Sequence, residues 1–359
     1  MEHSSKQTSA RLAVDLSAIR ENYACLSRIA SRAECAAVVK ADAYGLGMEK
    51  VAATLADAVQ TFFVAHPEEG KMLRAFLPKK RIFILHGFLP GYPEFMTMYN
   101  LIPVINSLEQ LKGWRSFCQR EGKEHPAALQ FDTGMSRFGL SCKDLCDEAV
   151  IDFRPVLLLS HLACADCPED IANTEQLRRF LNMTAAFPGV PRSLSASSGI
   201  FLGEKYHFDM VRPGIALYGL TPGYESNEFR LAIELEAQIL QIRQLCSGDR
   251  IGYGLTYRAE RSMRVATVGI GYADGIFRSF SEIGALWKDG IRLPIRGRIS
   301  MDSLSVDVTA LRSALLREGA WLSVIRSKQD LMRLADSVGT ISYEVLTSLG
   351  YRFDRFYRG

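Results

Sequence analysis

The sequence lacks the features of secreted, membrane-embedded and nucleic-acid-binding proteins. Residues 1–9 are polar and contain no apolar core of the kind found in signal peptides. No stretch of the chain is apolar for long enough to span a bilayer. The formal net charge is only +3, and the one basic cluster, at 78–81, is typical of a solvated turn. We therefore expect a cytoplasmic protein that binds neither membrane nor nucleic acid.

Nothing in the sequence requires disulfide bonds. The eight cysteines are dispersed through 359 residues, a length that can form a large core without covalent staples, so we expect reduced thiols. Four of them flank His161 at spacings that leave a zinc site open: Cys142, Cys146, Cys164 and Cys167. The Cys-x-x-Cys pair encloses Asp166 and lacks the glycine of a knuckle turn. A zinc-binding structural protein is therefore the weakest of the alternatives.

What the sequence has instead is a regular alternation of short apolar runs and amphipathic stretches. Eight runs have the composition of strands: 36–39, 61–65, 81–85, 102–105, 128–131, 156–160, 193–195 and 215–218. Helical patterns lie between them, including 15–29, 48–58, 67–75 and 107–121, and two of these have Asp15 and Ser107 as predicted N-caps. Eight strands that alternate with helices predict a (β/α)8 TIM barrel, an α/β fold whose active site lies at the carboxyl ends of the strands.

The pattern changes after residue 223. Short runs separated by glycine turns, at 232–242, 263–269, 291–295 and 303–308, predict a mostly antiparallel β-domain, and 328–338 predicts a late helix. We therefore divide the chain into three parts by residue number: a flexible N-terminal tail or strand (1–11), a barrel (12–228) and a C-terminal β-domain (229–359).

Lys40 lies at the carboxyl end of the first predicted barrel strand. The apolar run at 36–39 precedes it, and Gly45 and Gly47 follow at once. An amine at the edge of a buried strand is costly unless it is paired or loses its proton. A desolvated lysine becomes a nucleophile toward carbonyl groups. Taken alone, Lys40 fits a structural ion pair about as well as a catalytic role.

Other predicted strands also end in polar groups. Asp132 and Arg137 follow one strand, His161 follows the next, 195–199 offers hydroxyls and backbone amides, and Arg212 precedes the last run. Each has an ordinary structural explanation: an ion pair between Asp132 and Arg137, a core imidazole, or a helix cap. Together on one rim of a barrel, they favour a functional site.

Several blocks of the sequence are similar to one known family. The block VKADAYGLG at 39–47 resembles the cofactor-lysine motif of the alanine racemases. Further similar blocks follow in order over nearly the whole chain: 132–139, 161–163, 212–219, 251–254, 271–275, 297–302 and 341–344. The resemblance implies a pyridoxal 5′-phosphate (PLP) enzyme, with a barrel followed by a β-domain, that works as a homodimer.

The resemblance also implies roles for individual residues. Lys40 would hold PLP and act as one base, and Tyr253 would be the opposing base, donated to the partner's site. The residues implied to bind the cofactor are Lys40, Tyr44, His161, Ser197, Arg212, Gly214, Ile215 and Tyr351. Arg137 and the backbone of Met301 would receive the substrate carboxylate or the ring hydroxyl, and Met301 would also complete the partner's site. Five residues resemble those of a polar access passage: Asp166, Tyr272, Arg278, Arg298 and Asp302.

Arg212 resembles the group that faces the PLP ring nitrogen, and His161 resembles a support for Arg212. An arginine stays protonated and only donates hydrogen bonds, so it would leave that nitrogen unprotonated. The ring would then withdraw electrons more weakly, which suppresses transamination. Many PLP enzymes instead place an acid at this position.

The chain departs from the family pattern at two positions. Many members carry a lysine, modified to a carbamate, where this chain has Gln130. An amide forms no carbamate, but its carbonyl can accept a hydrogen bond from Arg137, so we expect no dependence on bicarbonate. Ala196 stands where an asparagine is frequent, which removes one polar contact near the phosphate.

The function implied by the resemblance is alanine racemase, which interconverts L- and D-alanine and supplies D-alanine for peptidoglycan. A serine or broad-specificity amino-acid racemase is a close alternative, because a pocket discriminates weakly against an added hydroxyl. A non-catalytic PLP-binding barrel would lack the β-domain that contains Tyr253, and a PLP decarboxylase on this plan would use an acid in place of Arg212. Sequence alone leaves open whether the role is biosynthetic or catabolic.

Overall fold

The computed structural model describes residues 8–359, and they form two compact units. One unit consists of residues 18–230, and the other combines the chain up to Ser17 with residues 231–359. The sequence placed these borders at 12 and 229. The difference at the N-terminus arises because β1 (Ala10–Asp15) pairs with β11 and β19 of the second unit. The part of the predicted tail at 1–7 lies outside the described residues.

The unit 18–230 is a parallel barrel. Seven strands pair in chain order: β3 (Ala37–Val38), β4 (Thr61–Val64), β5 (Arg81–Ile84), β6 (Ile102–Ile105), β7 (Ala128–Gln130), β8 (Leu158–Leu159) and β9 (Arg192–Ser193). An eighth strand, β10 (Met210–Val211), pairs with β2 (Glu34–Cys35), which directly precedes β3. Backbone hydrogen bonds of 2.9 Å join β10 to its neighbours on both sides, from Arg212 N–H to Ser195 O and from Ala36 N–H to Val211 O. The α/β barrel predicted from the sequence is confirmed.

One predicted strand was wrong. Residues 215–218 form a 3-10 helix, Ile215–Tyr218, and the eighth strand comes earlier, at β10. The run at 215–218 is fully buried, and a short buried apolar run cannot be assigned to strand or helix by its pattern alone.

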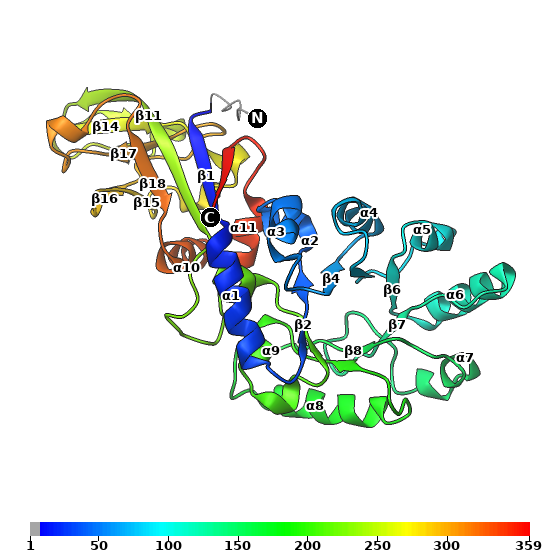
Figure 1. The fold of residues 1–359 in the computed structure, drawn as a ribbon. Helices are drawn as coiled ribbons and strands as arrows, with labels where there is room; N and C mark the ends of the chain where they lie inside the picture. The colour runs from blue at the N-terminus through cyan, green and yellow to red at the C-terminus, as the bar shows by residue number, and fades with distance from the viewer. Residues whose placement is uncertain (1–7) are drawn as a thin grey trace. The chain divides into compact units, whose positions relative to one another are not determined.

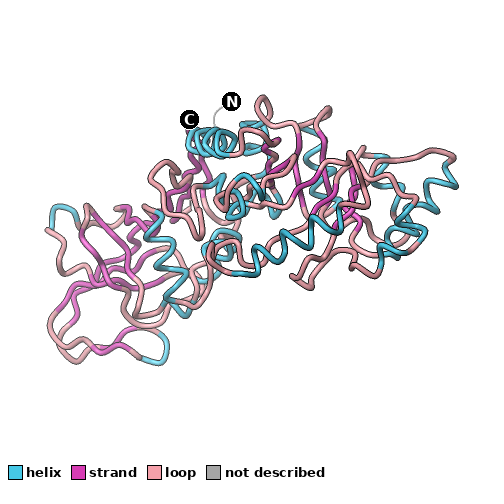
Figure 2. Tube along the Cα trace, turned by 90° about the horizontal axis from the view of Figure 1, so that it is seen from below, coloured by secondary structure: helices cyan, strands magenta, loops and turns pink. Residues whose placement is uncertain are grey.

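Helices follow most strands and lie outside them, as Figures 1 and 2 show. Those of this unit are α1 (Leu16–Ile29), α2 (Lys40–Gly45), α3 (Met48–Leu55), α4 (Pro67–Phe76), α5 (Pro93–Met98), α6 (Leu108–Glu121), α7 (Glu148–Ile151), α8 (Ile171–Thr184) and α9 (Ser197–Ile200). The predicted N-cap Ser107 accepts a hydrogen bond from the Gln110 N–H. Asp15 is the last residue of β1, directly before α1.

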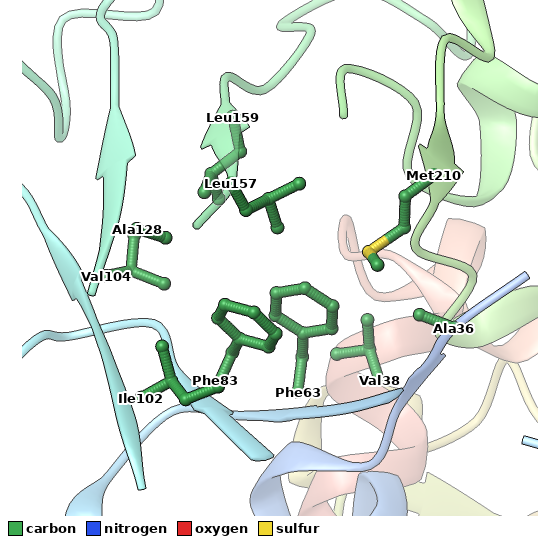
Figure 3. Close-up of a cluster of buried hydrophobic side chains, with 10 residues drawn as sticks. All are labelled: Ala36, Val38, Phe63, Phe83, Ile102, Val104, Ala128, Leu157, Leu159 and Met210. Carbon is green, nitrogen blue, oxygen red and sulfur yellow. The ribbon is translucent and has the colours of Figure 1, made fainter. Parts of the chain in front are cut away.

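Apolar side chains fill the barrel interior. Alternate residues of a strand point to the same face, and those of the barrel strands meet in one buried cluster (Figure 3): Ala36, Val38, Phe63, Phe83, Ile102, Val104, Ala128, Leu157, Leu159 and Met210. The rings of Phe63 and Phe83 stack with centroids 4.9 Å apart. Because these side chains fill the interior of the barrel, we expect a functional site at the carboxyl ends of the strands.

The second unit is mostly antiparallel, as predicted. Its central strand β11 (Ile233–Leu245) pairs with β1, β14 (Met263–Val268) and β18 (Trp321–Ile325). The remaining strands are β12 (Arg250–Ile251), β13 (Tyr257–Arg258), β15 (Ala285–Lys288), β16 (Ile291–Pro294), β17 (Leu304–Asp307) and β19 (Asp354–Arg358). The predicted late helix is α10 (Lys328–Ser337), and α11 (Ser342–Ser348) follows it. No helix among the described residues is long and apolar enough to cross a membrane.

Candidate active site

Lys40 stands at the carboxyl end of β3 and begins α2, as the sequence predicted. The four residues after it, Ala41 to Tyr44, all have left-handed backbone conformations with φ between 53° and 58°. Such a conformation costs an L-amino acid about 1–2 kcal/mol per residue. Strain of this kind persists only where surrounding contacts hold it, and it concentrates at functional sites.

Asp42 contributes contacts that hold this left-handed turn. Its Oδ1 accepts a hydrogen bond of 2.7 Å from the Met48 N–H, and its carbonyl accepts one of 2.9 Å from the Gly47 N–H. Both bonds tie the turn to the start of α3. The backbone that presents Lys40 is therefore fixed from the C-terminal side.

The surroundings of Lys40 lower the pKa of its amine. Burial lowers the pKa of Lys40, and the Arg137 guanidinium lowers it further, whereas Glu69 acts in the opposite direction. Burial also lowers the pKa of His161 to about 3, with smaller effects from Arg212, Arg137 and Lys40. His161 is therefore neutral at physiological pH, and a larger fraction of Lys40 is in the neutral form that acts as base or nucleophile.

Arg212 is a buried cation held inside the barrel. Its Nη1 donates a hydrogen bond of 2.5 Å to Ser193 Oγ, and its Nη2 donates one of 2.6 Å to the Ser160 carbonyl. Burial lowers the pKa of Arg212 to about 10, so it stays protonated at neutral pH. The Arg212 charge contributes to the lowered pKa of His161. The hydrogen bonds, however, go to Ser193 and Ser160, which the sequence did not single out, and the Ser160 contact uses a backbone atom that no sequence pattern identifies.

Four of the predicted cofactor-binding residues come together beside Arg212. Ser197 Oγ accepts hydrogen bonds from the Gly214 N–H (2.9 Å) and the Ala216 N–H (3.2 Å). The Tyr44 hydroxyl lies against Gly214, and Ile215 is fully buried in the turn that follows. The Tyr44 ring packs on Tyr218, with centroids 5.2 Å apart. This cluster gathers hydroxyl and backbone N–H groups, which are the donors that bind phosphate oxygens.

Arg137 is exposed in the loop after β7, and the ion pair with Asp132, the ordinary structural explanation for these two residues, is not the contact that orders the loop. Asp132 Oδ1 instead accepts hydrogen bonds from the Gly134 N–H (2.9 Å) and the Ser136 N–H (3.1 Å). The hydrogen bond predicted from Arg137 to the Gln130 carbonyl is not formed among the described residues. Gln130 Nε2 donates to the Phe138 carbonyl over 3.4 Å.

Asp166 lies exposed in the turn between Cys164 and Cys167, which a backbone hydrogen bond of 2.9 Å closes. All eight cysteines are free. Within residues 8–359, no group of three or more His, Cys, Asp or Glu side chains could hold a metal ion.

In the second unit, Tyr253 begins a one-turn 3-10 helix, Tyr253–Leu255, and its side chain is 69% exposed. The flanking glycines both have positive φ, and the predicted passage residue Arg298 packs against them. A Cβ at Gly252 would lie 3.2 Å from the Arg298 backbone nitrogen, and one at Gly254 would lie 2.9 Å from its guanidinium. The Gly-Tyr-Gly sequence thus lets this loop approach Arg298 while Tyr253 projects outward.

Two further loops of this unit gather most of the other predicted residues. The Tyr272 N–H donates to the Ser300 carbonyl, and the Ala273 N–H donates to the Met301 carbonyl, each over 3.0 Å. Asp302 accepts a hydrogen bond of 2.7 Å from Arg352, which follows the exposed Tyr351. Arg278 begins a 3-10 turn, Arg278–Phe280, and Ser281 at the end of this turn joins it to the second loop, because its Oγ accepts a hydrogen bond of 3.0 Å from the Ile299 N–H.

Comparisons with known proteins agree with this architecture. The model of the alanine racemase N-terminal domain matches residues 14–222, and that of the alanine racemase C-terminal domain matches 232–357. A curated relative from Agrobacterium fabrum, named a catabolic alanine racemase, is 43% identical over 97% of this chain and 92% of its own.

Two solved structures are similar over nearly the full length. The alanine racemase of Bartonella henselae, with covalently bound pyridoxal phosphate, is 39% identical with a TM-score of 0.94 and covers 98% of this chain and 100% of its own. The biosynthetic alanine racemase of Pseudomonas aeruginosa is 33% identical with a TM-score of 0.89 and the same coverage. The fold and the barrel-rim residues define a PLP-type barrel enzyme with an added β-domain. The chain belongs to the alanine racemase family.

Proposed function

We propose that this protein is a PLP-dependent racemase that interconverts L- and D-alanine. The proposal rests on the occurrence of two residues in one barrel. Lys40 has a lowered pKa and lies at the rim, and Arg212 is buried and hydrogen-bonded inside. PLP, when bound, withdraws electron density from the α-carbon of an amino acid and so makes its proton removable. The protein supplies the bases, the orientation and the charges.

The residues of the barrel fit this cofactor. Lys40 offers the amine that holds it, and Arg212 offers a guanidinium for the ring nitrogen, with neutral His161 beside it. Tyr44 and Ser197 offer hydroxyl donors for the phosphate, and the Gly214–Ile215 backbone lies beside them, with the Gly214 N–H donating to Ser197 Oγ. From the resemblance alone, Tyr351 joins this set.

Racemisation requires two bases, because the proton leaves one face of the α-carbon and another returns to the opposite face. We assign one role to Lys40 and the other to the Tyr253 phenol of the partner subunit in a homodimer. Arg137 and the Met301 backbone would receive the substrate carboxylate or the ring hydroxyl, and Met301 would also come from the partner. The exposed ring of Tyr253 supports an intermolecular role for this residue, because burial of a large exposed ring at an interface is energetically favourable. The substrate would reach the site past Asp166, Tyr272, Arg278, Arg298 and Asp302.

A complementation experiment tests the shared site. We expect the Lys40→Ala and Tyr253→Phe variants to be impaired as homodimers. After the subunits exchange, each mixed dimer contains one site with both bases, because the two defects fall in the other site. A random mixture therefore regains about a quarter of the wild-type rate. If differently tagged subunits exchange without any gain of activity, the shared site is wrong.

The metabolic setting is part of the proposal. The free thiols support a reducing, cytoplasmic location, where D-alanine would serve peptidoglycan synthesis. Relatives with this fold include one named catabolic and one named biosynthetic, so growth of a deletion strain with and without D-alanine decides between these roles.

The first experiment is chiral chromatography of L-alanine incubated with the purified, PLP-loaded protein, with L-serine in a parallel tube and Lys40→Ala as control. Equal amounts of both alanine enantiomers, reached much faster than for serine, support the proposal. Faster turnover of serine indicates the serine or broad-specificity alternative. A yellow protein that changes neither amino acid contradicts racemase activity and favours a cofactor carrier.

A further inference from the structure

We propose that Glu69 is a positioning residue that holds the catalytic lysine in place. Glu69 lies in the first turn of α4, directly after β4, and β4 is the barrel strand that pairs with β3. The inference rests on the role of Lys40 proposed above, and it adds an acid that the sequence analysis did not single out.

The Glu69 carboxylate joins two strand ends through three hydrogen bonds. Its Oε1 accepts the Ala41 N–H over 2.6 Å, and its Oε2 accepts the N–H groups of Ala65 (2.8 Å) and His66 (3.1 Å). An ionised carboxylate only accepts hydrogen bonds, and its two oxygens can take three or four. Bonds from backbone N–H groups to a charged acceptor are stronger than neutral ones. Glu69 therefore clamps the loop after β4 to the turn after β3.

The bonded Ala41 is the residue that directly follows Lys40 and the first of the four left-handed residues. Asp42 ties the far end of this turn to α3, whereas Glu69 ties the near end to the neighbouring strand. With both ends fixed, the strained turn has one arrangement, and Lys40 has a fixed starting point for its side chain. A reacting group must be held within fractions of an ångström for efficient catalysis.

Glu69 is also a negative charge in a positive neighbourhood. The charged or titratable groups that act on Lys40, or that are acted on together with it, come from several strand ends: Arg137 after β7, His86 after β5, His161 after β8, Arg212 after β10, and His66 before α4. Among those acting directly on Lys40, Arg137 lowers the pKa and Glu69 raises it. Glu69 thus limits how far the pKa of Lys40 falls.

The test compares Glu69→Gln with a matched control, Glu68→Gln. Glutamine has the same size, but only its oxygen accepts hydrogen bonds, so its NH2 group faces an N–H on one side of the clamp. Glu68 precedes it in the same turn, is exposed and pairs with Lys71 over 3.5 Å. The control removes the same charge one residue away and keeps the clamp. Glu69→Asp retains the charge and shortens the reach.

Three readouts separate positioning from general stability. In Glu69→Gln we expect the Ala41 amide of the holoenzyme to exchange with deuterium at least about tenfold faster. We expect the rate at which the apoprotein captures PLP to reach half its maximum at a lower pH, because the Glu69 charge, which raises the pKa of Lys40, has been removed. We expect kcat for alanine to fall about tenfold or more with a smaller change in KM. Glu69→Asp should keep the capture pH near that of the wild type, and Glu68→Gln should match the wild type in all three.

The outcomes also separate this inference from the proposed function. If folded Glu69→Gln matches Glu68→Gln in amide exchange and in capture pH, Glu69 does not position Lys40. If Glu69→Gln does not fold, Glu69→Asp decides: the inference holds if its capture pH stays near that of the wild type while Ala41 exchange accelerates, and is wrong if exchange is unchanged. If the wild type racemises no amino acid, the proposed function fails, whereas amide exchange and capture pH still decide the role of Glu69.

Discussion

A methyl group added at Gly214 tests the cofactor cradle directly. A Cβ at this position would overlap the Tyr44 hydroxyl and lie 2.9 Å from the Tyr44 Cζ. Tyr44 is 7% exposed and its ring packs on the fully buried Tyr218, so it cannot yield without disturbing its neighbours. Overpacking of this kind costs about 1–3 kcal/mol, which corresponds to a fall in Tm of about 2–12 °C for a unit of this size. Loss of the contact that we propose between Tyr44 and the phosphate should weaken PLP binding about tenfold to a hundredfold.

The assay is an absorbance titration of the apoprotein of Gly214→Ala with PLP, together with its thermal unfolding. Gly113→Ala is the matched control. Gly113 lies in the middle of α6, where an added Cβ meets Phe88 at an ordinary 3.5 Å. We therefore expect Gly113→Ala to raise the free energy of unfolding by about 0.5–1 kcal/mol. Tyr44→Phe in the Gly214→Ala background removes the overlapping oxygen and should recover part of the stability. If Gly214→Ala binds PLP as tightly as the wild type, Tyr44 and Gly214 do not form the cradle.

Three further predictions concern the bases, the Gln130 position and pH. We assign Tyr253 to the proton of L-alanine and Lys40 to that of D-alanine. In Tyr253→Phe, the α-proton of D-alanine should still exchange with solvent deuterium while exchange from L-alanine falls, and equal exchange rates by NMR contradict two separate bases. Racemisation should not respond to bicarbonate, because Gln130 forms no carbamate, and stimulation by bicarbonate in degassed buffer refutes this. His161 has a folded-state pKa of about 3 against an ordinary 6.5, so the unfolded chain binds more protons between these values. The free energy of unfolding should therefore decline as pH falls from 6.5 toward 3. His161→Gln should flatten that decline in denaturant titrations, and an unchanged slope contradicts the buried neutral imidazole.

Much of the fold follows from local pattern. The alternation of apolar runs and amphipathic stretches predicts seven of the eight barrel strands, because parallel strands buried on both faces appear as short continuous apolar runs. The eighth, β10, is missed because the fully buried apolar 3-10 helix that follows it, Ile215–Tyr218, gives the stronger signal. The pairing of β1 with β11 spans more than 200 residues, and no local signal reveals such a partner.

The sequence likewise indicates some residues of the candidate site and not others. Lys40 and His161 stand out in the sequence because each follows an apolar run, and Arg212 stands out because it precedes one. Ser193 and the Ser160 carbonyl, which bond Arg212, could not be predicted, because a serine within a strand and a backbone oxygen carry no distinctive pattern. Glu69 could not be predicted, because a glutamate in the first turn of a helix is ordinary on electrostatic grounds. Its hydrogen bond to the Ala41 N–H forms only when β3 and β4 lie side by side in the fold.

The charges of the barrel rim explain why this arrangement suits an anionic ligand. The groups that perturb His161 are all cationic, and Lys40 has one cation and one acid acting on it. Arg212 has its hydrogen bonds satisfied by a hydroxyl and a carbonyl, neither of which carries a formal charge. Burial is the largest cause of the lowered pKa values of His161 and Lys40, and neighbouring cations add to it, so His161 stays neutral and Lys40 loses its proton more easily. A phosphate and a substrate carboxylate would supply the missing negative charge. The Arg137 charge that adds to the lowering of the Lys40 pKa would thus also receive the substrate carboxylate, and the Arg212 charge that adds to the lowering of the His161 pKa would also face the cofactor.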